Sequence, residues 1–306
     1  MRSTPTYLVT GAGGGVGGVS RLVVEQLIAR DETVRAMVHR EDSRANALRE
    51  IGAQVVVGDL TNPADVAAAM SGITRMFFNM SVSASYLEAT AEVCVAAAGL
   101  GGLELLVNMS QMTVSEMTAT STGESRQHRL HWLAEHVINW SPIPAVHVRP
   151  TVFLDNPLFT VLAAQSIREH DQLALPFGTG RTSPIAAADV ADAVAAVLVS
   201  PHEHVDAVYE LTGPAALDID GLAAAYSAAL GRRIQAVRLP YDEWLDHLGE
   251  VGLDPHVQQH IATMAKLHHD GRYNRMTTDL QRITGHQAQS VEQYIRLHRN
   301  RFGLSP

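Results

Sequence analysis

The chain has 306 residues, of which 46% are hydrophobic, enough for one large α/β domain or for a domain with a smaller lobe. Its 23 basic and 32 acidic side chains give a formal net charge of −9, which argues against direct binding of nucleic acid through a broad basic surface. The single cysteine, Cys94, excludes a disulfide within the chain, and its apolar neighbours are typical of a buried, inert thiol.

The chain starts with "MRSTPTYLVTG", which has no apolar signal-peptide core before the first predicted strand. No stretch reaches the roughly 18 uninterrupted apolar residues that a membrane helix needs. We therefore expect a cytoplasmic protein that does not bind a membrane.

Through residue 150, short β-branched runs alternate with longer segments of helical composition. The predicted strands are residues 6–10, 33–38, 53–58, 75–80, 103–108 and 143–150. This alternation is typical of stacked βαβ units, whose parallel strands carry helices on both faces. We expect an α/β fold in which residues 1–150 form a Rossmann-like, doubly wound, dinucleotide-binding domain.

After residue 150 the regular alternation ends. Turn residues fill 175–185, an alanine-rich helix is predicted over 186–200, and a strand over 207–213. We expect residues 151–306 to form a smaller, mostly helical α/β lobe that binds substrate, with a segment at about 183–212 returning to the first domain. No low-complexity linker separates the two parts, so they should pack directly and form a substrate cleft.

The glycine-rich stretch "VTGAGGGVGG" follows the first predicted strand. A phosphate loop begins where the strand ends, because the turn has to direct the N–H groups of the next helix at the pyrophosphate. The strand ends at Thr10, so the register that opens at Gly11 is favoured over the shifted one that opens at Gly13. The predicted pyrophosphate-binding residues are Gly11, Gly14, Gly15, Val16 and Gly17.

The second predicted strand is followed by His39, Arg40 and Glu41. A cation at this point compensates a 2′-phosphate, whereas a carboxylate accepts hydrogen bonds from the free ribose hydroxyls of NAD. The two basic residues come first, so the sequence favours NADP(H), with NAD(H) as the alternative if Glu41 turns towards the ribose. Asp59 and Leu60 follow the third strand, where they would contact the adenine, although Asp59 could instead cap the helix that begins near residue 63.

Residues that follow the later strands should line the ligand site, because ligands bind at the carboxyl edge of such sheets. Asn79 and Met80 close the fourth strand and are predicted to contact the nicotinamide half, unless Asn79 only bonds turn backbone. The predicted substrate-pocket residues are Ser110, Phe153, Leu154, Asn156 and Phe177. Apolar walls of this kind suit a flat aromatic substrate, although the same residue types fit an ordinary core.

His256 and His260 have the i, i+4 spacing of two metal ligands on one helix. They lack the adjacent glutamate of a metalloprotease helix, and the spacing marks no third ligand. The sequence therefore predicts no metal site.

Several stretches together resemble the NmrA-like group of atypical short-chain dehydrogenases, among them "VTGAGGGVG", "GAQVVVGDLTNPADVAAAMSGI", "HWLAEHVI", "VRPTVFLDN" and "FGTGRTSPIAAADVADAVAAVL". Members of that group include type-2 NAD(P)H:quinone oxidoreductases, triphenylmethane dye reductases and redox-sensing transcriptional co-regulators. The resemblance runs over nearly the whole chain. It implies a Rossmann-like domain with a small C-terminal lobe and NADP bound in the cleft between them.

The resemblance also assigns roles to single residues. It implies that His39 takes the 2′-phosphate position, with Arg40 next to it, and that Asp59 contacts the adenine. It places His131 where active members carry the lysine of Tyr-x-x-x-Lys, and Gln127 where they carry the tyrosine. An amide cannot donate a proton and persist as a stabilised anion, so the usual tyrosine step is unavailable.

Hydride transfer to a conjugated acceptor mainly needs proximity in a dry pocket, and such an acceptor can take its protons from water. We therefore expect an NADP(H)-dependent oxidoreductase that acts on a quinone-like or conjugated carbonyl compound, with His131 and Asn79 as candidate catalytic residues. His131 would position the nicotinamide ribose or donate a proton. The alternative is an ordinary helix histidine paired with Glu135 at i, i+4.

The alternative function is a non-catalytic NADP(H)-sensing regulatory protein of the NmrA type. A sugar-nucleotide epimerase is disfavoured by Gln127 at the tyrosine position. The expected partner is a small aromatic or quinone-like molecule, and the sequence is also compatible with a homodimer.

Overall fold

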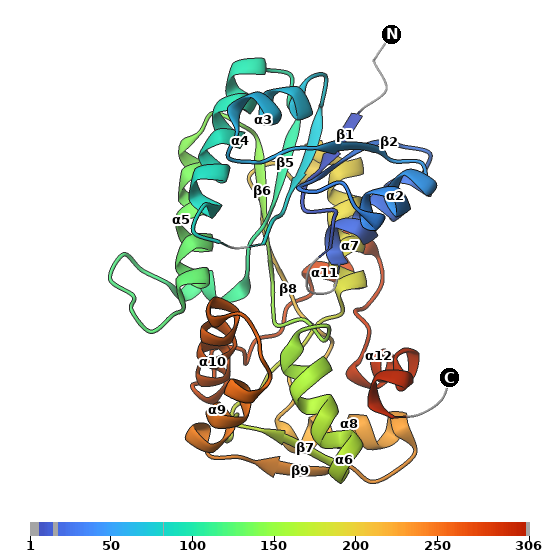
Figure 1. The fold of residues 1–306 in the computed structure, drawn as a ribbon, viewed down its shortest axis with the longest axis vertical. Helices are drawn as coiled ribbons and strands as arrows, with labels where there is room; N and C mark the ends of the chain where they lie inside the picture. Colours follow the sequence, from blue (N-terminus) through green and yellow to red (C-terminus); the bar gives the residue numbers. More distant parts are fainter. Residues whose placement is uncertain (1–5, 15–17, 82, 304–306) are drawn as a thin grey trace.

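The computed structural model describes residues 6–14, 18–81 and 83–303. Seven parallel strands form one sheet in the order β3-β2-β1-β4-β5-β6-β8 (Figure 1). In that order the strands are Gln54–Val57, Thr33–Val38, Thr6–Val9, Arg75–Phe78, Leu105–Met109, Ala145–Pro150 and Val208–Leu211. The chain winds outward from β1 in both directions, so the predicted doubly wound, Rossmann-like α/β fold is confirmed.

Helices cover both faces of this sheet, because alternate residues of a strand point to opposite sides. Tyr7 and Val9 pack on one side against α1, α2, α7 and α11, while Leu8 packs on the other side with α3, α4 and α5. These helices are Val19–Ile28 (α1), Ser43–Glu50 (α2), Pro63–Met70 (α3), Tyr86–Leu100 (α4), Arg126–Trp140 (α5), Ala187–Val199 (α7) and Asp279–Thr284 (α11). Burial on both sides explains why the central strands are apolar along most of their length.

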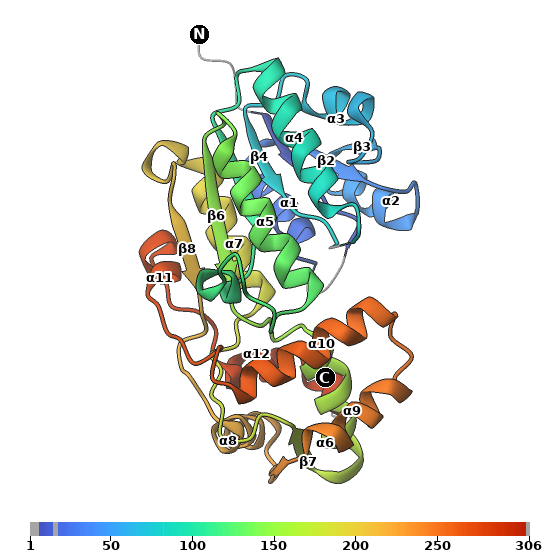
Figure 2. The ribbon, with the colours of Figure 1, turned by 90° about the vertical axis from the view of Figure 1, so that its left-hand side faces the viewer.

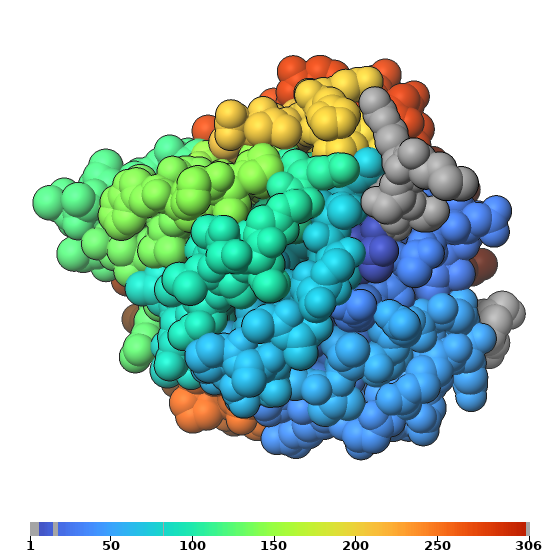
Figure 3. All heavy atoms as spheres, turned by 90° about the horizontal axis from the view of Figure 1, so that it is seen from above, coloured from blue at the N-terminus to red at the C-terminus, as the bar shows by residue number. Residues whose placement is uncertain are grey.

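Segments from the second half of the chain complete the sheet. Strand β8 pairs with β6, and the His147 N–H donates to the Ala207 carbonyl at 3.1 Å just before the paired residues. In the view from above, the yellow segment between α7 and β8 lies beside the green segment that enters β6 (Figure 3). Helix α7 packs against α1, and α11 packs against both α7 and β8.

The smaller lobe lies at the carboxyl edge of the sheet (Figures 1 and 2). It contains α6 (Ala164–His170), β7 (Gln172–Leu175), α8 (Ile219–Leu230), β9 (Gln235–Arg238), α9 (Tyr241–Glu250), α10 (Pro255–His269) and α12 (Val291–Leu297). Tyr226, Trp244 and Phe302 are buried at its centre. Strands β7 and β9 pair in parallel as a separate two-stranded sheet, which the sequence analysis did not predict.

Cys94 is buried in α4, and burial raises the pKa of its thiol, so the predicted buried thiol is confirmed.

None of the helices within the described residues combines the length and the apolar character that a membrane span requires.

The turn after β8 requires glycine at position 213, because a side chain there would meet backbone. The Gly213 N–H donates to the Ser183 carbonyl at 2.9 Å, and a Cβ at Gly213 would lie 2.1 Å from the Pro184 carbonyl oxygen. We expect Gly213→Ala to lower the free energy of unfolding by about 2 kcal/mol or more, because a backbone atom cannot move aside cheaply. Gly99→Ala is the matched control, because a Cβ there meets nothing within 4 Å in an exposed part of α4. Urea unfolding that ranks the two variants equally would contradict this.

Candidate functional site

A cavity of about 520 Å³ lies between the carboxyl edge of the sheet and α10 of the smaller lobe. Residues of both lobes line it, among them Gly11, Asn79, Ser110, His131, Phe153 and Met264. A second hollow of about 460 Å³ follows the ends of β2 and β3. The two share Gly11, Gly14, Met80 and Ser81, so together they form one extended site on both sides of the glycine loop.

The glycine loop follows β1 as the sequence predicts. Gly11 has φ +68°, and a Cβ added to it would lie 2.5 Å from the Asn79 carbonyl oxygen, so the turn after Thr10 requires glycine. Gly14 has φ +107° and lines both halves of the site. The other predicted loop residues, Gly15, Val16 and Gly17, lie outside the described residues.

Asn79 and Met80 lie at the end of β4 and line the cavity. The Asn79 backbone N–H donates to Thr10 Oγ1 at 2.9 Å, and the Asn79 side-chain amide donates from Nδ2 to Ser20 Oγ at 2.9 Å. The side chain is therefore held by α1, in addition to the bonds that its backbone makes in the turn.

The far end of the site has a basic rim formed by His39, Arg40 and Arg44. Arg44 is paired with Asp42, whereas the Arg40 guanidinium makes no hydrogen bond or ion pair within the part of the chain that the structure describes.

The carboxylate that could have favoured NAD is engaged elsewhere. Glu41 accepts two hydrogen bonds from Arg49, one of them 2.8 Å long between Nη2 and Oε2, which lowers the pKa of Glu41. Glu41 is therefore not turned towards the site as the NAD(H) alternative requires.

Asp59 and Leu60 line the same hollow after β3. The Thr61 N–H and hydroxyl donate to Asp59 Oδ1 at 2.9 and 2.8 Å, and these bonds, the backbone one first, lower the pKa of Asp59. Helix α3 is capped by Asn62, whose side chain accepts from the Ala64 N–H, so Asp59 does not cap that helix. The contact of Asp59 with the adenine stays a prediction.

His131 lines the cavity from α5. Its Nδ1 lies 3.2 Å from the Tyr86 hydroxyl, and burial lowers the pKa of His131 to about 4, against the opposing charge of Glu135. Glu135 itself forms a buried ion pair with Arg149, with Nε at 2.9 Å from Oε1. The alternative pairing of His131 with Glu135 is therefore not present, and His131 is a neutral imidazole held by Tyr86.

Three of the five predicted pocket residues line the cavity, namely Ser110, Phe153 and Asn156. Leu154 and Phe177 do not line it, because both are buried in the core of the smaller lobe. Phe177 stacks on His268 with ring centroids 4.1 Å apart, and His268 stacks in turn on Tyr273. The assignment of these two residues to the pocket is thus corrected by the packing of α10 against the loop after β7.

The cavity also contains residues that were not among the predicted pocket residues. His128, Gln127 and Tyr273 line it, as do His256 and His260 from α10. His260 Nδ1 lies 2.8 Å from Ser125 Oγ at the start of α5. The i, i+3 spacing of His128 and His131 could have indicated that both side chains share one face of α5.

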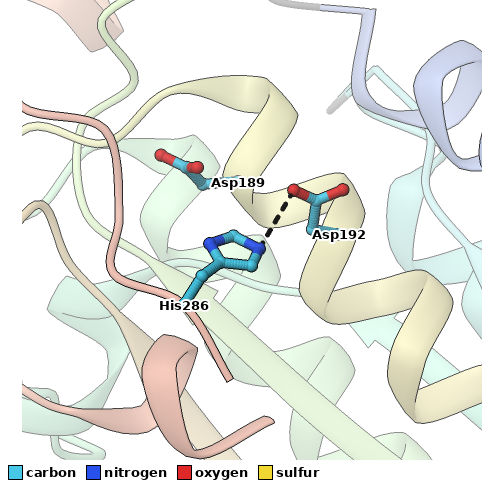
Figure 4. Close-up of side chains that lie close together, drawn as sticks. All are labelled: Asp189, Asp192 and His286. Atoms are coloured by element: carbon cyan, nitrogen blue, oxygen red, sulfur yellow. Dashed lines mark ion pairs between the residues drawn. The ribbon is translucent and has the colours of Figure 1, made fainter. Parts of the chain in front are cut away.

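Asp189, Asp192 and His286 form a second polar cluster, and none of them lines the cavity (Figure 4). Their possible ligand atoms lie within 4.8 Å of one another. His286 Nε2 lies 3.4 Å from Asp192 Oδ2, and Asp189 Oδ2 accepts from the Gln289 N–H at 2.8 Å. Asp192 also accepts from Gln26 on α1. The cluster therefore joins α7 to α1 and to the segment that follows α11.

The fold and the site together define a dinucleotide-binding protein. The chain belongs to the NAD(P)H-binding family, whose model matches residues 14–201.

Known proteins of similar sequence or structure agree with this family. The NAD(P)H azoreductase of Xenophilus azovorans is 26% identical over 294 residues, which cover 95% of this chain and 98% of that protein. The NADPH-dependent quinone oxidoreductase of Escherichia coli, solved with NADPH, has a TM-score of 0.83 at 22% identity and covers 96% of this chain and 100% of its own. NmrA, a negative transcriptional regulator solved with NADP, has a TM-score of 0.80 at 17% identity and covers 99% of each chain.

The last two likenesses show a shared fold. The predicted NmrA-like resemblance and the prediction of NAD(P)H as the cofactor are confirmed by the family and by these relatives.

Buried neutral histidines give the stability of this protein a defined pH dependence. Burial lowers the pKa of His268 to about 3, while its ordinary value is 6.5. Between these two pH values His268 is protonated in the unfolded chain but neutral in the folded chain. The free energy of unfolding therefore falls as the pH drops from about 6.5 towards 3.

We expect His268→Phe to reduce the slope of unfolding free energy against pH by up to about 1.4 kcal/mol per pH unit within this window. Phenylalanine keeps the stack between Phe177 and Tyr273. Thr182→Val is the control, because it removes the hydroxyl 3.2 Å from His268 Nε2 without removing the titrating group. Urea unfolding between pH 5 and 7.5 checks this, and an unchanged slope in His268→Phe would contradict it.

Proposed function

We propose that the chain is an NADP(H)-dependent oxidoreductase that reduces a quinone-like, conjugated carbonyl or azo compound. The observation that carries the proposal is the cavity, where the glycine loop and the carboxyl edge of the sheet meet an apolar wall from the smaller lobe. The azoreductase and quinone oxidoreductase relatives support a reductase.

The residues at the site fit a dinucleotide. Gly11 and Gly14 leave backbone without side chains beside the shared part of the site, and the hollow beyond it ends at Asp59 and the basic rim. An unpaired guanidinium at Arg40 is suited to a 2′-phosphate, which supports a preference for NADP(H). When bound, the reduced dinucleotide would supply hydride to an acceptor in the cavity.

The residues around the reacting centre would position the nicotinamide half and exclude water from it. They would not transfer a proton through a tyrosine. Asn79, fixed by Ser20, and His131, fixed by Tyr86, would hold the nicotinamide half and its ribose. Phe153, Ile261 and Met264 provide apolar surface that excludes water. This arrangement suits a flat conjugated acceptor that does not need an acid in the same step.

The preference for NADP(H) can be measured with one substitution. We expect Arg40→Ala to raise the Kd for NADPH about tenfold or more, because a charge-assisted bond to the 2′-phosphate is lost, and to leave the Kd for NADH within about twofold. Arg21→Ala is the control, since Arg21 is an exposed arginine paired with Glu25 on α1. Calorimetric titration that shows equal losses for both nucleotides would contradict the assignment.

Turnover separates the reductase from a sensor that only binds NADP(H), the alternative that the likeness to NmrA favours. We expect steady loss of NADPH absorbance with a panel of quinones and azo dyes, and His131→Phe should lower kcat at least about tenfold. Tight NADPH binding without consumption across the whole panel would support the sensor instead.

A further inference from the structure

The start of α5 fixes the proton of one cavity histidine. Ser125 is the N-cap of this helix, and its backbone N–H donates to His128 Nδ1 at 3.2 Å. In return, Ser125 Oγ accepts from the His128 backbone N–H at 3.3 Å, which completes a capping box. An N–H group can only donate, so His128 Nδ1 must accept. A neutral His128 therefore carries its proton on Nε2.

His128 is held neutral by its surroundings. The residue is 1% exposed, and burial holds its pKa well below the ordinary value. It lines the cavity, and Nε2 makes no hydrogen bond to any residue that the structure describes. The donor on Nε2 is thus available to a molecule in the cavity.

The smaller lobe reinforces this arrangement. His260 of α10 places Nδ1 2.8 Å from the same Ser125 hydroxyl, and its ring centroid lies 4.6 Å from that of His128. The His128 ring is therefore held between its own helix cap and a residue of the opposite lobe. Ser125 and His260 are positioning residues for His128.

We propose that His128 is a catalytic residue, donating a hydrogen bond from Nε2 to the acceptor heteroatom on which negative charge develops. This inference rests on the proposed reductase function. In an azo acceptor, hydride adds to one nitrogen, the N=N π bond breaks, and the other nitrogen takes the electron pair. The hydride that bound NADPH would supply carries both electrons, and water then supplies the proton. In a quinone the charge develops on oxygen.

A fixed neutral donor beside developing charge is an effective stabiliser, because it needs no reorganisation during the reaction. The charge of the reduced acceptor decides whether its reduction depends on His128. Azo and quinone acceptors become anions on taking up hydride and depend on the donor. A cationic triphenylmethane dye becomes neutral at its central carbon, so it should not depend on His128.

The test compares His128→Leu with wild type on an azo dye, a quinone and a cationic triphenylmethane dye, with NADPH as donor. We expect kcat to fall about 30-fold or more for the first two acceptors and less than about threefold for the cationic dye. His128→Gln should recover part of the loss, because glutamine at this position keeps the capping box and offers an N–H donor. The control is His136→Leu on the outer side of α5, where His136 packs against Trp132.

Equal losses on all three acceptors, or no loss on any, would overturn the role of His128. If wild type consumes no NADPH with any of the three acceptors, the proposed function fails and this inference fails with it. If wild type turns over and His128→Leu matches it, only the inference fails.

A second measurement does not depend on turnover. Nitrogen-15 spectra of the histidine rings, with His128 assigned by its loss in His128→Leu, should show the proton on Nε2 in the free protein. A proton on Nδ1 would overturn the proposal whatever the kinetics.

Discussion

The site depends on the close approach of two segments, the loop after β1 and the end of β4. The Gly11 backbone lies so near the Asn79 carbonyl that a Cβ would come within 2.5 Å of it. Thr10 fastens the contact by donating from Oγ1 to the Asn79 carbonyl at 2.8 Å and accepting from the Asn79 N–H. Because β1 and β4 are adjacent and parallel, this contact places the glycine loop beside the residues that close β4. Both halves of the extended site start from this point.

A second constraint holds the smaller lobe over that edge. Arg272, just after α10, donates to Glu124 at 3.1 Å and to the Thr113 carbonyl at 3.2 Å, both in the first domain. The Glu124 side chain is only 5% exposed, so losing Arg272 would leave a nearly buried charge unpaired. With the bond between His260 and Ser125, these contacts hold α10 against the start of α5. These contacts therefore hold the apolar wall of the cavity over the edge of the sheet.

The sheet, the glycine loop and the edge of the pocket could be predicted because their causes are local in the sequence: β-branched runs, and glycines where a strand ends. Contacts between distant residues could not. Glu41 is bound by Arg49, 8 residues away, and His260 meets Ser125 across 135 residues. Phe177 was assigned to the pocket together with the residues that follow the sixth predicted strand, yet it stacks on His268 in the core of the smaller lobe. Each of these side chains could contact several kinds of residue, and the tertiary packing determines which contact forms.

The chemistry proposed for this cavity follows from Gln127 and His131, the residues that the family resemblance places at the positions of the tyrosine and the lysine. An isolated ketone that takes up hydride becomes an alkoxide, a strong base that needs a proton in the same step. With Gln127 and a neutral His131 at those positions, the cavity is poorly equipped for that step. An azo or quinone acceptor spreads its new charge over a conjugated system, so it persists until water protonates it. Under the proposed function, neutral N–H donors in an apolar cavity would stabilise such an anion, so the proposal favours delocalised acceptors over simple carbonyls.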